Sequence, residues 1–98
     1  MEIKMIDKDS KVLITTAHRG VFYGTLQDTM DNGKTVELSN ARCAIYFGTT
    51  GGFLELADTG PTATSRIGSM VSEIILYDVT SVTNVSPAAA ERWENWKK

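Results

Sequence analysis

The residues able to do catalytic chemistry are few, and they are not arranged for catalysis. His18 is the only histidine, and it lies in a predicted turn beside Arg19, whose charge disfavours a protonated imidazole. Cys43 is the only cysteine and lies in an apolar run, where we expect a buried, inert thiol. A nucleophile needs an oriented base next to it, and no pair of carboxylates has a spacing that brings its members together. We therefore expect no enzyme activity and no catalytic residue.

Metal and cofactor motifs are also lacking in the sequence. A metal site requires several His, Cys, Asp or Glu side chains at ligand spacing, and the chain has no such set. Its Gly-rich loop is not a P-loop, because no Lys follows the glycine and no helix follows at once. We expect neither a metal nor a cofactor.

A long loop is predicted over residues 58–72, and loops of this length inside small domains often carry function. Its glycines and hydroxyl residues expose backbone N–H groups, and Arg66 adds a planar fork of donors, so the loop suits a phosphate or carboxylate. The alternative is a solvated loop in which Arg66 pairs with Asp58 or Glu73. The candidate ligand-binding residues here are Thr59, Thr62, Thr64, Ser65 and Arg66.

Two further arginines lie at predicted turns with aromatic residues near them in the sequence. An arginine and an aromatic ring together can neutralise a phosphate and stack on a base. The alternative is that the aromatic side chains belong to the core or to cross-strand pairs. This second group of candidate ligand-binding residues is His18, Arg19, Arg42, Tyr46 and Phe53.

The elements that must position these residues are mostly strands. Gly24 predicts a bend within a strand, Asp31-Asn32-Gly33 predicts a hairpin turn, and Ser86-Pro87 predicts a capped helix start. We expect Trp93 and Trp96, on one face of that helix, to anchor it. The predicted strands are Lys11–Thr16, Val21–Leu26, Thr35–Leu38, Cys43–Phe47, Phe53–Ala57, Glu73–Tyr77 and Val79–Val85.

The composition fits one small globular domain. The chain has 98 residues, of which 42% are hydrophobic and 22% charged, enough for one core but not two. We predict a mainly β fold: a small, strongly bent antiparallel sheet or a small barrel, with a long loop insertion and a short C-terminal helix. The expected organisation is a single domain over 1–98, with an N-terminal segment at 1–10, the sheet at 11–85 and the helix at 87–97.

Charge and cysteine content bear on partners and location. The net charge of −2 gives no overall field to hold a polyanion, so nucleic acid is a disfavoured partner. A single cysteine indicates a reducing cytoplasm and no disulfide, so we expect a homo-oligomer to supply the missing stability. The first ten residues lack the apolar region of a signal peptide, and no run is long enough for a membrane span.

The order of pieces resembles Sm-like and related SH3-like barrels over residues 11–39 and 73–87. The bent strand with Gly24-Thr25-Leu26, the Asn-Gly hairpin and the final Val-Thr-Ser-Val-Thr-Asn-Val-Ser-Pro carry the resemblance. It implies rings built by pairing edge strands, with nucleotides held by loop residues equivalent to Asn32 and Tyr77-Asp78. Sm-like proteins differ in carrying their helix at the N-terminus and in lacking an insertion as long as residues 42–72.

A second set of motifs covers nearly all of the chain after Ser10: His18-Arg19-Gly20-Val21-Phe22, Asn40-Ala41-Arg42, Gly52-Phe53-Leu54, Thr59-Gly60-Pro61-Thr62, Ser65-Arg66-Ile67-Gly68 and Leu76-Tyr77-Asp78-Val79-Thr80. On these motifs the chain resembles small uncharacterised proteins encoded by phages and prophages. The resemblance implies a phage protein in the host cytoplasm, a setting where small proteins often disarm host defence.

Three functions are consistent with the sequence. The first is a non-enzymatic anti-defence protein that sequesters a small phosphorylated or nucleotide-derived ligand, such as a host immune signal. The second is an Sm-like binder of single-stranded nucleic acid. The third is a protein–protein inhibitor or a structural phage protein.

Overall fold

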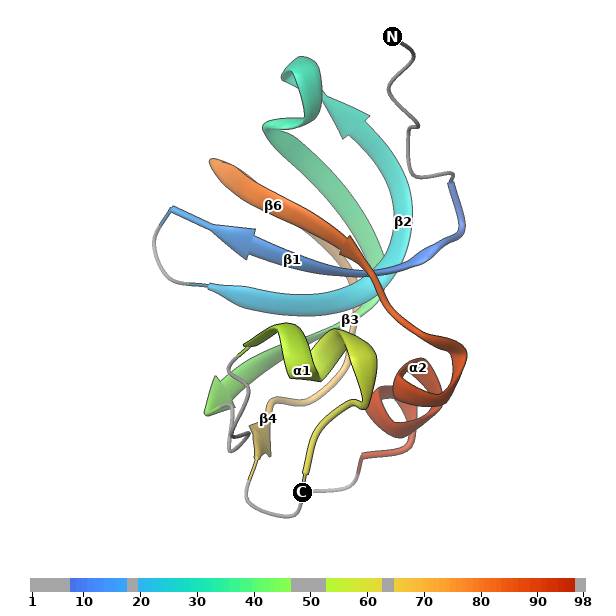
Figure 1. Ribbon diagram of the computed structural model, residues 1–98. Coiled ribbons are helices and arrows are strands. Elements are labelled where there is room, and N and C mark those ends of the chain that lie inside the picture. Colours follow the sequence, from blue (N-terminus) through green and yellow to red (C-terminus); the bar gives the residue numbers. More distant parts are fainter. Residues whose placement is uncertain (1–7, 18–19, 47–52, 63–64, 97–98) are drawn as a thin grey trace, which may run out of the picture.

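The computed structural model describes residues 8–17, 20–46, 53–62 and 65–96 (Figure 1). A bent sheet forms one half of the molecule as drawn, and two short helices and a two-residue strand lie together in the other half. The elements in chain order are β1 (Lys11–Thr16), β2 (Val21–Met30), the 3-10 turn η1 (Asp31–Gly33), β3 (Thr35–Tyr46), α1 (Phe53–Asp58), β4 (Arg66–Ile67), β5 (Val71–Leu76), β6 (Val79–Asn84) and α2 (Pro87–Glu94).

The strands form one antiparallel sheet in the order β4-β3-β2-β1-β6, and β5 pairs with β3 alongside this path. The mainly β fold with a strongly bent antiparallel sheet and a short C-terminal helix is therefore confirmed. The long strands β2 and β3 curve through the molecule (Figure 1), and their pairing carries two register shifts. Gly24 lies at this bend, where a Cβ atom would meet Leu38 at 3.0 Å.

The predicted turn at Asp31-Asn32-Gly33 is confirmed as the connection between β2 and β3. All three residues have positive φ angles, 55° at Asp31, 57° at Asn32 and 86° at Gly33. Asn, Asp and Gly adopt this left-handed region more readily than other residues do. The turn therefore depends on the residue types that the sequence provides there.

A hydrophobic cluster covers each face of the sheet, because successive side chains of a strand point to opposite faces. Val12 and Ile14 belong to the cluster inside the bend, together with Leu38. Leu13, between them in β1, belongs to the second cluster, in which Trp93 of α2 is buried. The two helices thus cover the outer face of the sheet and extend its core.

One predicted strand is a helix, and two other predicted strands are parts of a single strand. Phe53–Ala57, predicted as a strand, forms the helix α1, in which the adjacent residues Leu56 and Ala57 are both buried. Two neighbouring buried positions fit a helix packed against α2, whereas the alternation of a strand would expose one of them. The predicted strands Thr35–Leu38 and Cys43–Phe47 are one strand, β3, up to Tyr46. Asn40, with a φ of 50°, lies at a bulge where the register with β2 shifts, and β3 continues beyond it. Phe47 itself lies outside the described residues.

The predicted loop at residues 58–72 also contains structure, because Arg66 and Ile67 pair with β3 as the strand β4. The predicted helix starts at Pro87 and ends at Glu94, earlier than residue 97, and Asn95 occupies the C-cap. Among the described residues, no helix is long and apolar enough to cross a membrane.

Candidate functional site

Arg42, a predicted ligand contact, is 7% exposed and bonds within the fold. Its Nε atom donates to the Gly68 carbonyl at 2.8 Å, and its Nη1 atom donates to the carbonyls of Trp93 at 2.8 Å and Trp96 at 2.6 Å. These two carbonyls lie at the end of α2, where the helix dipole is negative. Burial lowers the pKa of Arg42 from its ordinary value. The guanidinium therefore joins β3 to the end of α2.

The hydroxyl residues of the predicted loop bond to nearby groups of the chain. Thr59 Oγ1 donates to the Glu55 carbonyl at 3.2 Å and so extends the last turn of α1. The Thr62 N–H donates to Ser65 Oγ at 2.9 Å, and the Ser65 N–H donates to the Thr62 carbonyl at 2.8 Å. Ser65 is buried, whereas Arg66 is exposed at the start of β4, opposite Tyr46. Of the predicted contacts in the described part of this loop, Thr59 and Arg66 are exposed to solvent.

Tyr77 and Asp78 form the break between β5 and β6, and Asp78 has a φ of 55°. The Asp78 carbonyl accepts the Ala17 N–H at 2.9 Å, and the Val79 N–H donates to the Lys34 carbonyl at 3.0 Å. These bonds place the strand break beside the end of β1 and the turn that follows η1. The predicted site residues whose side chains the structure describes thus fall into two groups, one at this strand break and one around β4.

Five predicted contacts cannot be placed. His18, Arg19 and Thr64 lie outside the described residues, and the side chains of Tyr46 and Phe53 do as well.

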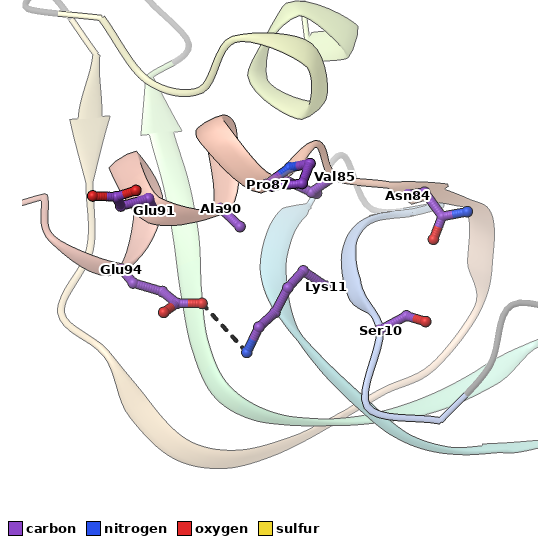
Figure 2. Close-up of a pocket in the computed structure, with 8 residues that line it drawn as sticks. All are labelled: Ser10, Lys11, Asn84, Val85, Pro87, Ala90, Glu91 and Glu94. Carbon is purple, nitrogen blue, oxygen red and sulfur yellow. Dashed lines mark ion pairs between the residues drawn. The ribbon is translucent and has the colours of Figure 1, made fainter.

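A groove that the sequence did not predict runs along α2 beside the start of β1 (Figure 2). The volume of this open groove is about 510 Å³. Lys11 Nζ lies 3.3 Å from Glu94 Oε2 across the groove and donates to Thr25 Oγ1 at 2.8 Å. The lining residues are Ser10, Lys11, Asn84, Val85, Pro87, Ala90, Glu91 and Glu94.

Glu94 also accepts a hydrogen bond from the buried Tyr23 hydroxyl. The Tyr23 ring stacks on Trp93, with the ring centroids 5.2 Å apart and the planes at 6°. Burial, and then the neighbouring Glu94 carboxylate, raise the pKa of Tyr23 above its ordinary value. Lys11 and Tyr23 thus both bind Glu94 and hold the end of α2 on the sheet. In the described ranges, no three His, Cys, Asp or Glu side chains could together hold a metal ion.

A row of exposed side chains lies on β5, which the sequence analysis did not treat as a binding surface. Within the described part of the chain, β5 pairs with β3 alone, so its other edge is open. Val71 and Ile75 are each 46% exposed, and Tyr77, just past the strand, is 65% exposed. With the exposed Glu73, they occupy alternate positions, which we call the β5 row: Val71, Glu73, Ile75 and Tyr77.

Comparison with known proteins places the chain in a family. A family described as a domain of unknown function (DUF6948) matches residues 9–93, from just before β1 to the last turn of α2. The chain belongs to the DUF6948 family. Membership of an uncharacterised family, as predicted, is confirmed. No curated protein matches this DUF6948 domain, so its site has to be judged from its own geometry.

Proposed function

We propose that this DUF6948 domain is a non-enzymatic binding protein that acts through protein–protein contacts, and that the β5 row makes these contacts. The observation that carries the proposal is the exposure of Val71, Ile75 and Tyr77 along an open strand edge. This corresponds to the third of the functions that the sequence allows, a protein that acts by binding other proteins.

An edge strand presents unpaired N–H and C=O groups to any other strand, and soluble proteins protect such edges with Lys, Pro, bulges or covering loops. From Val71 to Leu76 the sequence is Val-Ser-Glu-Ile-Ile-Leu, with one charge and neither Lys nor Pro. An apolar edge of this kind suits β-augmentation, in which a partner strand adds to the sheet.

The test compares the double variant Ile75→Lys/Tyr77→Lys with Leu54→Lys, a matched control at a site on α1 that is 55% exposed. Size measurements over a range of concentrations and capture from a lysate of the source organism would report association. We expect the wild type and the control to associate, and the double variant to lose association while it still unfolds in one cooperative transition. Association that survives in the double variant, or is absent from the wild type, would refute the proposal.

As a second proposal, the protein sequesters a small phosphorylated or nucleotide-derived ligand. The anti-defence role in a phage and the relationship to Sm-like barrels belong to this second proposal. Arg66 supports it, because this arginine is exposed beside the backbone of Tyr46. Calorimetry with a panel of cyclic and ADP-ribose-type nucleotides tests it. Arg66→Ala should weaken binding without lowering the melting temperature, and a panel without any binding nucleotide would exclude it.

A further inference from the structure

The open edge of β5 also indicates which partner it fits, an inference that rests on the proposed function. We infer that the partner is β5 of a second copy of this chain, paired antiparallel about a two-fold axis at Ile74.

Besides β5, the described sheet ends at β4, which is only two residues long, and at β6, whose chemistry differs from that of β5. β6 pairs with β1. On the outer face of the sheet, to which Leu13 belongs, Thr83 of β6 lies opposite Leu13 and Ser81 lies opposite Thr15. The Ser81 hydroxyl is hydrogen-bonded to that of Thr15. A β5 strand added to β6 would place its apolar row beside hydroxyl groups. A β5 strand added to β5 continues the apolar row across the contact.

The pleat restricts how two β5 strands can pair. Residues that lie opposite each other in an antiparallel pair point to the same face of the sheet. In β5, Ile74 and Leu76 face the core inside the bend, opposite Leu38 and Val36 of β3. A one-residue shift would oppose core-facing to solvent-facing positions. The partner strand can therefore shift only in steps of two residues, and each step moves the two-fold axis by one residue. The two registers with the fullest overlap have the axis at Glu73 or at Ile74.

Glu73 distinguishes these two registers, because it is the only charged residue from Val71 to Leu76. An axis at Glu73 sets this carboxylate directly against Glu73 of the partner subunit, and like charges in opposite positions are destabilising. An axis at Ile74 sets Glu73 against Ile75 of the partner subunit instead.

The axis at Ile74 also sets Val71 against Tyr77 of the partner subunit. An aromatic residue opposite a β-branched one is a favourable cross-strand pair. A two-fold contact uses the same edge of both chains, so two chains occupy it fully. The expected assembly is a dimer with a continuous sheet and not a ring.

Cysteine pairing tests the register while keeping Glu73 in place. In a Cys43→Ser background, one chain carries Val71→Cys and a second carries Tyr77→Cys; both positions are exposed. We expect a disulfide-linked dimer after mild oxidation of the mixture, far in excess of that formed by either chain alone, and a two-chain mass by sedimentation for the wild type. Melting curves before oxidation confirm that each variant is folded.

Other results would overturn the inference. Linking of Val71→Cys to Ile75→Cys in preference to Tyr77→Cys would show the register with Glu73 opposite itself. A ring-sized assembly that is lost in Ile75→Lys/Tyr77→Lys, or a wild-type monomer that captures a different protein through the β5 row, would refute the two-fold β5 pair while leaving the proposed function intact. Assembly unaffected by the double variant would refute both.

Discussion

At the scale of single residues, Arg42 shows how a side chain's role depends on distant parts of the chain. Arginine near aromatic residues is typical of a site for a phosphorylated ligand, and this reasoning made Arg42 a candidate. Its acceptors are carbonyls of Gly68, Trp93 and Trp96, between 26 and 54 residues further along the chain. Sequence spacing gives no sign of such contacts.

Replacing Arg42 with Met should destabilise the fold strongly. The change removes three hydrogen bonds from a charged donor, one of them buried, so we expect a loss of about 3 kcal/mol in the free energy of unfolding. Urea unfolding measures it. The matched control is Arg66→Met on the exposed side chain of β4, for which we expect a change within about 0.5 kcal/mol. Equal stability of the two variants would contradict the structural role of Arg42.

Tyr23 should make stability depend on alkaline pH. Its pKa is raised in the folded state, so the folded chain retains a proton that the unfolded chain releases. The contribution of Tyr23 is therefore complete below the ordinary tyrosine pKa of about 10 and is lost as the pH rises above it.

The variant for this pH test is Tyr23→Phe, which keeps the ring that stacks on Trp93 and loses the hydroxyl that bonds to Glu94. At pH 7 we expect it to be less stable than the wild type by about 1 kcal/mol. Urea unfolding at several pH values should show this difference shrinking above pH 10. A difference that stays constant or grows would contradict the interpretation.

At the scale of elements, the sequence predicted best where local chemistry decides the structure. The turn at Asp31-Asn32-Gly33 and the helix start at Ser86-Pro87 depend on φ angles and on a cap, which short motifs specify. The segment starting at Phe53 was assigned wrongly because its short apolar pattern fits both a strand and a helix, and packing against α2 decides between them. β3 was divided for a similar reason, because Asn40 resembles a turn residue but lies within a continuous strand.

Ser86 joins the two helices, and its loss should affect both. Its Oγ accepts the Ala89 N–H at 3.1 Å as the N-cap of α2 and donates to the Asp58 carbonyl at 2.7 Å, at the end of α1. We expect Ser86→Ala to lower the free energy of unfolding by about 1 to 2 kcal/mol. Ser72→Ala, at an exposed position on β5, is the control and should have little effect. Thermal or urea unfolding that ranks the two variants equally would argue against this link.

At the scale of the whole molecule, the sequence predicted the bent sheet but not which residues come together. The groove beside α2 combines Lys11 and Glu94 from opposite ends of the chain, and no motif connects them. Within the described residues, the predicted site residues divide between the surroundings of β4 and the Tyr77-Asp78 break, because the strand order carries these segments to different parts of the sheet. Strand order also determines that β5, whose first two residues fall within the predicted loop at 58–72, presents the exposed apolar edge.

If β5 pairs with β5 of a second copy, stability must depend on protein concentration. Unfolding then separates two chains, so mass action favours the folded dimer as concentration rises. A tenfold increase in concentration adds about 1.4 kcal/mol per dimer, which raises the melting temperature measurably. Calorimetric melts of the wild type and of Leu54→Lys should show this rise, whereas Ile75→Lys should melt at one temperature throughout. A wild-type melting temperature that is independent of concentration over the micromolar to millimolar range would mean that the chain folds and acts without this partner.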